Sequence, residues 1–528
     1  LNMATIYQHP DKRTVTVSVF PANRGLKSSI SEALLSPEEL SESNNIIHTT
    51  YATRRTRPGI ESYYVSGFGS GEEVKWIMDF WRTSGSSQNQ KAVAVTNGRI
   101  YSDSADGIFT KIGDVASNSL TKNVTGDVLV GFMVIGIEDE VPQKYVQGTA
   151  TAALGGSPPT GWIIRKHKSR IFLTGVKTAP HTVYYSSVEN PEEWSGGTRG
   201  SIVLDLGASD PYGNTAIFED LFGELYVAKW NSLYQITTSA SPFVVRPLLS
   251  TVGCISHNAV ASTQNDVIFP SERGLHSLAT TLNYGDVEAK YLSFPVHDIW
   301  HELIDFTKAK QISAAFVPEY NSYLMCYPDK TSGNFNLLGY NVVTQDFFHW
   351  EDFNATFVAP FVDSSKRRRL MIGTTDGNIG IGRTIEDTAF LDFLAAFNTT
   401  FKTAIMFPGG RASGTFGFKE LTVYFQTRST DTIVGTYRIG SLGARSFSLN
   451  QGSTGILLGN FVLGDLLGAP GSLLSRTVPL TGYGNSIQLG FSTTASSSTG
   501  TDGAAMEIFG YDIECEKVGD TLENVSVG

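Results

Sequence analysis

Two histidines, His297 and His301, stand four residues apart, the spacing that places both imidazole rings on one face of a helix. Zinc proteases use this spacing with a glutamate directly after the first histidine, where it acts as general base. In this sequence Asp298 follows His297, its side chain is one methylene shorter, and no obvious third ligand follows. The pattern therefore favours an amphipathic helix with solvated polar residues over a zinc site.

Glycoside hydrolysis is a second candidate chemistry, because some sialidases are β-propellers that carry Ser-x-Asp-x-Gly-x-x-Trp boxes. The segment from Ser104 to Phe109 lacks the residue between Asp106 and Gly107, and Thr374 to Gly377 departs in the same way. Such boxes form turns remote from catalysis, whereas hydrolysis needs two carboxylates at a fixed separation. A serine nucleophile elbow and a phosphate-binding Gly-Lys-Ser/Thr loop are also missing. We predict no catalytic residue, no cofactor and no metal ligand, and we expect the chain not to be an enzyme.

The densest positive cluster of the chain is formed by Lys366, Arg367, Arg368 and Arg369. One interpretation is a solvated hairpin edge, whose charges deter pairing with a strand of another molecule. The other is contact with a negatively charged partner surface or with DNA phosphates.

A segment rich in leucine near the C-terminus is a candidate contact between subunits. It is too short and too interrupted to span a bilayer. It either folds back onto its own domain or forms an apolar patch that a neighbouring subunit covers. The residues expected at such a contact are Leu457, Leu458, Phe461, Leu463, Leu466 and Leu467.

Composition and charge exclude several classes of protein. The 528 residues include 40 Lys+Arg and 51 Asp+Glu, a net charge of −11, which argues against a general nucleic-acid binder. A hydrophobic content of 41% is high enough to exclude disorder as the main state. The three cysteines are odd in number and far apart, so we expect no disulfide framework and folding in a reducing cytosol. No signal peptide and no membrane span are visible.

Apolar strand pairs separated by turn residues recur through the middle of the chain and indicate hairpins. Two of the turns contain Asn97-Gly98 and Asp376-Gly377, dipeptides that adopt the positive φ angles that tight hairpins require. The six expected pairs are 92–95 with 100–101, 171–173 with 183–185, 225–227 with 233–236, 267–269 with 275–278, 323–325 with 337–340, and 370–372 with 379–381.

The last five pairs recur at intervals of roughly 50 residues, which is typical of a β-propeller. We therefore predict an all-β chain with a propeller of about six blades over residues 55–385. A longer gap of 78 residues separates Val93 from Ile171 and is attributed to an inserted loop around 147–160.

Other segments complete the expected organisation. Residues 1–54 are expected to be partly helical and to dock on the propeller or on a neighbour. Helices are predicted over 72–81 and 296–308, the latter from apolar spacings of three and four. Strand-like alternation near Leu421, Ile487 and Met506 predicts a C-terminal β-sandwich, jelly-roll-like, over 386–528.

The order of motifs resembles that of the tail nozzle proteins of short-tailed bacteriophages, also called tail tubular or DNA-stabilisation proteins. Arg57-Pro58-Gly59 is similar to the entry motif of that family. The most distinctive stretch runs from Ser169 to Gly175 and then from Val183 to Trp194. Further matches are 225–234, 252–257, 266–269 and 292–296, the last leading into the helix with the two histidines.

The resemblance implies a structural virion protein, made in the bacterial cytoplasm, that assembles as a homo-oligomeric ring, commonly of six subunits. In that family the ring lies below the portal and adaptor, continues the DNA channel and closes it until infection. Adaptor and portal proteins, tail fibre, spike or needle proteins and passing double-stranded DNA are the implied partners, with contact to the host surface also open. None of the motifs is catalytic. Two alternatives stay open: a glycan-binding adhesin of the phage tail and, less favoured, a propeller glycoside hydrolase.

Overall fold

The computed structural model divides the chain into two compact units. Unit 1 comprises residues 1–61, 339–351 and 383–528, and unit 2 comprises 62–338 and 352–382. The structure describes residues 5–8, 14–49, 53–64, 66–69, 71–84, 87–105, 107–115, 122–195, 198–204, 211–239, 242–249, 251–279, 291–351, 354–363, 365–387, 389–410, 414–429, 431–451, 473–493 and 503–519.

Unit 2 consists of small antiparallel sheets that follow one another along the chain, seven of them within the described residues. Their strands are β7 (Val74–Ser84), β8 (Ser87–Thr96), β9 (Arg99–Ala105), β10 (Ile108–Asp114); β11 (Val124–Leu129), β12 (Phe132–Ile137), β13 (Gln143–Tyr145), β14 (Ala152–Ala153); β15 (Ile163–His167), β16 (Arg170–Thr174), β17 (Thr182–Tyr185), β18 (Gly200–Val203); β19 (Ala216–Glu219), β20 (Leu225–Ala228), β21 (Leu233–Thr237), β22 (Val244–Leu249); β23 (Ala261–Ser262), β24 (Val267–Pro270), β25 (Leu275–Ser277); β26 (Ser313–Val317), β27 (Ser322–Pro328), β28 (Phe335–Asn341); and β30 (Ala355–Val362), β31 (Arg368–Thr374), β32 (Ile379–Gly382).

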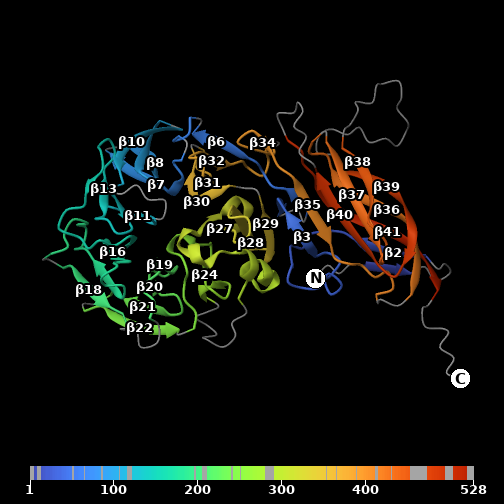
Figure 1. Cartoon of the computed structure of the whole chain (residues 1–528), viewed down its shortest axis with the longest axis horizontal. Coiled ribbons are helices and arrows are strands. Elements are labelled where there is room, and N and C mark those ends of the chain that lie inside the picture. Colours follow the sequence, from blue (N-terminus) through green and yellow to red (C-terminus); the bar gives the residue numbers. More distant parts are fainter. Residues whose placement is uncertain are drawn as a thin grey trace. The chain divides into compact units, whose positions relative to one another are not determined.

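The first elements of successive sheets contact one another in a closed cycle. Strand β7 contacts β11, β11 contacts β15, and β15 contacts β19. The short 3-10 turn η1 (His257–Ala259), just before β23, then contacts β19 and β26, and β30 contacts both β26 and β7. Figure 1 shows the sheets of unit 2 following each other around this ring. A ring of small sheets around a common axis is a β-propeller-type arrangement.

The predicted strand pairs are present, whereas the explanation of the long gap is wrong. Strands β8 and β9, β16 and β17, β20 and β21, β24 and β25, and β31 and β32 pair as expected, and β27 neighbours β28. The gap attributed to an inserted loop at 147–160 instead holds a complete sheet, β11 to β14, whose last strand lies inside that range. This sheet is why seven sheets are found where about six were predicted.

The helix predicted over 72–81 is also wrong, because these residues begin β7. A register shift between Val74 and Trp76 interrupts the pairing of β7 with β8. After this irregularity Ile77 and Phe80 are buried together with Val74. A β-bulge adds one residue to the alternation of a strand, which gives Val74 and Ile77 a helix-like spacing of three; Ile77 and Phe80 lie on opposite faces of β7, and both are buried.

The helix predicted over 296–308 forms only as short turns. The 3-10 turn η2 (Phe294–Val296) is followed by the single π-helical turn η3 (Ile299–Leu303) and by η4 (Phe306–Gln311). A further 3-10 turn, η5 (Pro318–Tyr320), follows β26. None of the helices in the described part of the chain is both long and apolar enough to cross a membrane.

Unit 1 is built mainly from two sheets whose strands come from both ends of the chain. In the first, strand order is β1-β2-β41-β36-β39, with β5 beside β41 and β4 beside β5; in the second it is β3-β35-β40-β37-β38. The strands of unit 1 are β1 (Thr5–Gln8), β2 (Thr14–Val19), β3 (Leu40–Asn44), β4 (Ile46–His48), β5 (Arg54–Thr56), β29 (Asp346–Trp350), β33 (Leu391–Asp392), β34 (Ala395–Ala396), β35 (Thr399–Thr403), β36 (Thr415–Gln426), β37 (Thr432–Ile439), β38 (Arg445–Asn450), β39 (Leu473–Gly484), β40 (Ile487–Thr493) and β41 (Glu507–Gly519); β6 (Ile60–Tyr64) begins in unit 1.

The N-terminal segment 1–54 was expected to be partly helical, and its described residues are not. It supplies strands β1 to β4 and the first residue of β5 to the two sheets of unit 1. Strand β2 pairs with β41 over six residues, from Thr14 with Glu516 to Val19 with Tyr511. The alternation of buried and half-buried residues along β2 explains this pairing, since a period of two is the pattern of a strand with one covered face.

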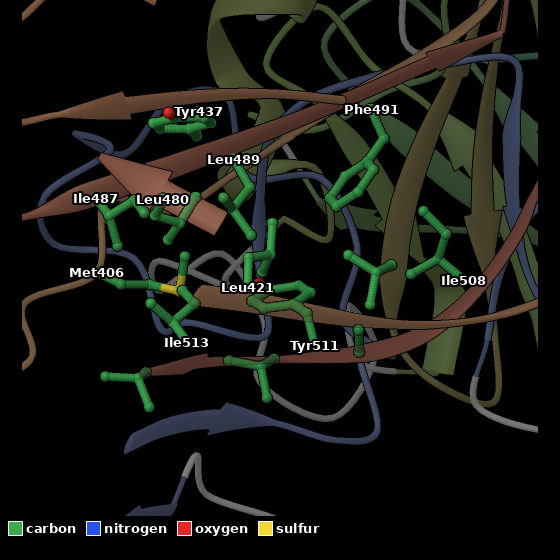
Figure 2. Packing of buried hydrophobic residues seen from close by; sticks show 14 of the residues in the cluster. Met406, Leu421, Tyr437, Leu480, Ile487, Leu489, Phe491, Ile508, Tyr511 and Ile513 are labelled. Atoms are coloured by element: carbon green, nitrogen blue, oxygen red, sulfur yellow. The ribbon is translucent and has the colours of Figure 1, made fainter. Parts of the chain in front are cut away.

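Side chains of both sheets meet in one hydrophobic cluster. Leu421 of β36 and Ile513 of β41 come from the first sheet, and Leu489 and Phe491 of β40 come from the second. Figure 2 shows these side chains pointing into a common interior together with Tyr511. All five are almost completely buried, so their contacts hold the two sheets together.

Candidate functional site

The basic cluster lies where the turn between β30 and β31 ends in unit 2, with Lys366 and Arg367 before β31 and Arg368 and Arg369 as its first two residues. The Asp363 carboxylate accepts a hydrogen bond from the backbone of Arg367 at 2.9 Å, which closes the turn. Lys366 has a φ of 62°, a left-handed conformation that tight turns require. Lys366, Arg367 and Arg368 are exposed. Three cations are therefore presented to solvent by a well-defined hairpin.

Arg369 differs from its three neighbours because its guanidinium turns back onto the protein. Its Nε donates to the carbonyl of Gly382 at 2.9 Å, and its Nη1 lies 3.8 Å from Asp363 Oδ2. Only 13% of its side chain is exposed. The sequence cluster of four is thus divided into three residues suited to contact a partner and one that supports the hairpin.

Arg368 also lines a cavity of about 480 Å³ at the axis of unit 2. The innermost strands contribute apolar walls such as Phe316 and Phe357, and the same cavity is lined by Asp79, Arg165 and Glu219. Each of these three charged residues comes from the first strand of a different sheet. The cavity therefore combines an apolar interior with charges of both signs.

The pKa values of Asp79 and Glu219, the two acids of this cavity, are shifted in opposite directions. Burial raises the pKa of Asp79 to about 6, although its carboxylate accepts hydrogen bonds from the Val362 backbone at 2.9 Å and from Gln90 at 3.1 Å. Burial is the largest single influence on Glu219 and raises its pKa, but the hydrogen bond with His167 and the charges of His167, Arg165 and Lys166 together outweigh it, and the net shift is downward. Near neutral pH, Asp79 is the acid in this cavity that can exchange a proton.

A side chain also spans the ring across its axis. Asn258 Nδ2 donates to the carbonyl of Val124 at 3.0 Å, and the two residues belong to η1 and β11, which are not neighbours in the ring. Beside it, burial and the nearby charge of Arg165 lower the pKa of His257 to about 3, so this imidazole is neutral at physiological pH. A hydrogen bond therefore bridges the ring beside the axial cavity, which Asn258 also lines.

The Arg-Pro-Gly motif near the N-terminus has a packing role in unit 1. The Arg57 side chain is fully buried, and its Nη1 donates to Asp392 Oδ1 at 2.8 Å while Nη2 bonds the second carboxylate oxygen. Its guanidinium lies 3.8 Å from the ring centroid of Phe397 and 5.3 Å from that of Trp350. Gly59 approaches the backbone of Leu391 so closely that a Cβ would lie 2.3 Å from its carbonyl oxygen.

The motifs of the central sheets also occupy packed positions. Arg170 donates to the carbonyls of Ser186 at 2.8 Å and Thr198 at 2.7 Å, and its guanidinium lies 5.4 Å from the Tyr185 ring centroid. Lys229 is completely buried. Trp194 is buried, and its Nε1 donates to the Pro191 carbonyl at 2.8 Å. These residues shape loops and hairpins of unit 2.

Two sequence candidates remain, the histidine pair and the leucine-rich segment. The rings of His297 and His301 lie 4.1 Å apart, but within the described residues no group of three or more His, Cys, Asp or Glu side chains could hold a metal ion. Burial lowers the pKa of His301, and the nearby His297 lowers it further. The leucine-rich contact segment, 457–467, lies outside the described residues.

The sequence did not point to Asp79, Arg165 and Glu219 as residues of a shared cavity. Asp79, Arg165 and Glu219 lie 86 and 54 residues apart and share no local motif. A signal was present only in their placement, because each is a charged residue inside the innermost strand of its repeat.

Comparisons with known proteins find remote structural likeness only. No family model and no curated protein matches the sequence. The chain aligns with the extracellular domain of BT3049, a putative hybrid two-component system of B. thetaiotaomicron, with a TM-score of 0.42 at 11% identity. It aligns with the extracellular domain of BT4673, a putative one-component system of the same organism, with a TM-score of 0.41 at 14% identity. The alignments cover 85% and 62% of this chain but 62% and 40% of those domains, so the chain spans less than two thirds of their length. BamB from Moraxella catarrhalis aligns over 63% of this chain and 98% of its own at 10% identity, with a TM-score of 0.34.

Proposed function

We propose that the chain is a structural virion protein of a short-tailed bacteriophage and forms the distal tail nozzle ring. The order of its motifs is the observation that carries the proposal. Residues of the Arg-Pro-Gly entry and of the central motifs lie in packed positions that shape the two units, as expected of motifs that specify a scaffold. In this role loops and surfaces, rather than catalytic side chains, act on partners.

The architecture that we assign to this role is a seven-bladed propeller and a jelly-roll-like β-sandwich. The seven sheets of unit 2 and their cycle of contacts support the first. The two sheets of unit 1, with one shared hydrophobic cluster, support the second.

The DNA channel in this proposal is formed by a ring of copies of the chain, most simply six, and not by the axis of one propeller. The hydrogen bond from Asn258 to Val124 crosses that axis, and the axial cavity is only about 480 Å³ in volume. Adaptor and portal proteins would bind above the ring, and fibre, spike or needle proteins would bind elsewhere on it. The exposed cations Lys366 to Arg368 are candidate contacts with such a partner or with passing DNA.

Electron microscopy and sedimentation of the full chain, alone and mixed with portal–adaptor complexes of the phage that encodes it, test the proposal. We expect a closed ring, with about six times the mass of one chain, that attaches to the adaptor end. A chain that stays monomeric in both mixtures and does not bind the complexes would overturn it.

A further inference from the structure

A second pocket of unit 2 lies among loops that belong to neighbouring sheets. Its volume is about 630 Å³, within the range of roughly 300 to 1,000 Å³ found for small-molecule sites. Trp162 precedes β15, Tyr212 precedes β19, and Trp230 lies between β20 and β21, and all three rings line the pocket. We propose that this pocket binds a neutral saccharide, a function that goes beyond the proposed nozzle role.

Trp230 and Tyr212 form the aromatic wall of the pocket. Their ring centroids are 6.0 Å apart at an angle of 41°, and 52% of Tyr212 is exposed. The indole Nε1 of Trp230 donates to Glu272 Oε2 at 2.8 Å, which fixes the orientation of the ring. A pyranose ring has an apolar face of C–H groups, and a fixed aromatic surface offers that face a large contact area at low entropic cost.

Trp162 provides a second, more deeply placed ring. Only 4% of this residue is exposed, and the Lys310 ammonium lies 5.8 Å from its ring centroid. Gly175 has a φ of 75°, and a Cβ at this position would lie 2.8 Å from Trp162 Nε1. A glycine is therefore required for the loop to pass this closely over the indole.

The polar lining indicates hydroxyl groups rather than charged groups on the ligand. Lys310 is paired with Glu138 at 2.8 Å, and Lys177 lies 3.8 Å from Asp139. These two lysines face three carboxylates, including Glu272, so no net positive charge is left to bind a phosphate or a sugar acid. Carboxylate oxygens accept hydrogen bonds from hydroxyl groups, which a neutral sugar supplies in abundance.

Asn214 adds a polar group at the wall of the same pocket. Only 7% of the residue is exposed, and its Nδ2 donates a hydrogen bond to Thr174 Oγ1 at 2.9 Å. Its Oδ1 has no hydrogen-bond partner among the described residues. This oxygen is itself shielded from the pocket, so Asn214 contributes a rigid polar wall and not a direct contact with the ligand.

Four variants separate a saccharide site from a merely exposed aromatic surface. Trp230→Ala removes the platform, and Glu272→Ala releases the indole without changing the ring. Glu272→Gln keeps an acceptor for Trp230 Nε1 and is expected to restore binding that Glu272→Ala loses. Phe222→Ala is the matched control, because Phe222 is 92% exposed in the turn between β19 and β20 of the same sheet and does not line the pocket.

The probe is an array of neutral and anionic bacterial surface oligosaccharides, with maltohexaose and chitohexaose included, followed by titration of the intrinsic tryptophan fluorescence of the full chain. We expect neutral sugars to bind with little dependence on salt, at least a tenfold loss of affinity for Trp230→Ala, and no change for Phe222→Ala. Circular dichroism confirms that each variant is folded.

Three outcomes would overturn the proposal. They are a wild-type chain that binds no saccharide on the array, a preference for anionic sugars that is lost in salt, and a Trp230→Ala variant that binds like the wild type. Ring formation is measured separately by sedimentation, so a ring that binds no sugar refutes this proposal and leaves the nozzle proposal intact.

Discussion

Replacing Arg57 by alanine is expected to destabilise unit 1 more than any exposed charge deletion. The guanidinium is fully buried and bonds both oxygens of Asp392, whose side chain is 16% exposed, and it also donates to Asn45 Oδ1 at 2.9 Å. Removing one partner of such a pair leaves a largely buried carboxylate without its counter-charge, which costs about 3 to 5 kcal/mol. The contact with the Phe397 ring at 3.8 Å is lost in the same step.

The measurement is urea unfolding of the full chain, followed by circular dichroism and by tryptophan fluorescence. Trp350 is the single tryptophan of unit 1, and its ring lies 5.3 Å from the Arg57 guanidinium, so its emission reports locally. A double-mutant cycle with Asp392→Asn isolates the pair, and a coupling of about 1 to 3 kcal/mol is expected for groups in direct contact.

Lys402→Met is the matched control for Arg57→Ala. Lys402 pairs with Glu42 at 2.5 Å in the same unit, but the two side chains are 49% and 58% exposed. An exposed pair is screened by water, so a change below about 1 kcal/mol is expected. The reasoning is refuted if Arg57→Ala destabilises the chain no more than Lys402→Met does.

Three further predictions follow from the same contacts. Burial raises the pKa of Asp79 from 3.8 to about 6, so the folded state holds this proton more tightly than the unfolded chain does. The free energy of unfolding should therefore fall by at most about 3 kcal/mol as pH rises from about 4 to about 6, and Asp79→Asn should remove that slope in pH-dependent melts. Burial raises the pKa values of the three cysteine thiols, so a thiol reagent at mildly alkaline pH should label them only after the chain is denatured. Rapid labelling of the native chain would contradict their burial. The triple variant K366S/R367S/R368S should have a free energy of unfolding within about 0.5 kcal/mol of the wild type and should lose salt-dependent retention on heparin or DNA. Arg369→Ser should lower the free energy of unfolding, because the Arg369 side chain bonds Gly382; equal stability of the two variants would refute the division of the cluster.

Hairpins were predictable because their signals are local. Leu225 to Val227 and Leu233 to Ile236 pair as predicted, across the turn that contains Asn231 and Ser232. Each such pair needs only an apolar run, a turn and a second run, all within about a dozen residues. The strands of the C-terminal region near Leu421 and Ile487 were found by the same alternation.

The sheet from β11 to β14 was missed because its first turn lacks the usual residues. Val130 and Gly131 join β11 to β12 with φ angles of 50° and 76°. A two-residue turn with both φ angles positive normally carries Asn-Gly or Asp-Gly, whereas valine is branched at Cβ and rarely adopts this conformation. With no turn signal between them, the two strands are not recognised as a hairpin from the sequence, and the length of the interval is attributed to an inserted loop around 147–160.

Sites formed by ring closure are a different problem, because the sequence carries no information on which distant residues will meet. Asp79 and Glu219 become neighbours of one cavity only when the first strands of separate sheets line a common axis. The same holds for the second pocket, where Trp162 and Trp230 come from loops of successive sheets. In such a fold the residues of one site come from separate sheets, and no local motif marks them as partners. A candidate site therefore has to be sought from the order of the sheets around the ring, and the sheet from β11 to β14, which fills the long gap in the repeat, has to be placed first.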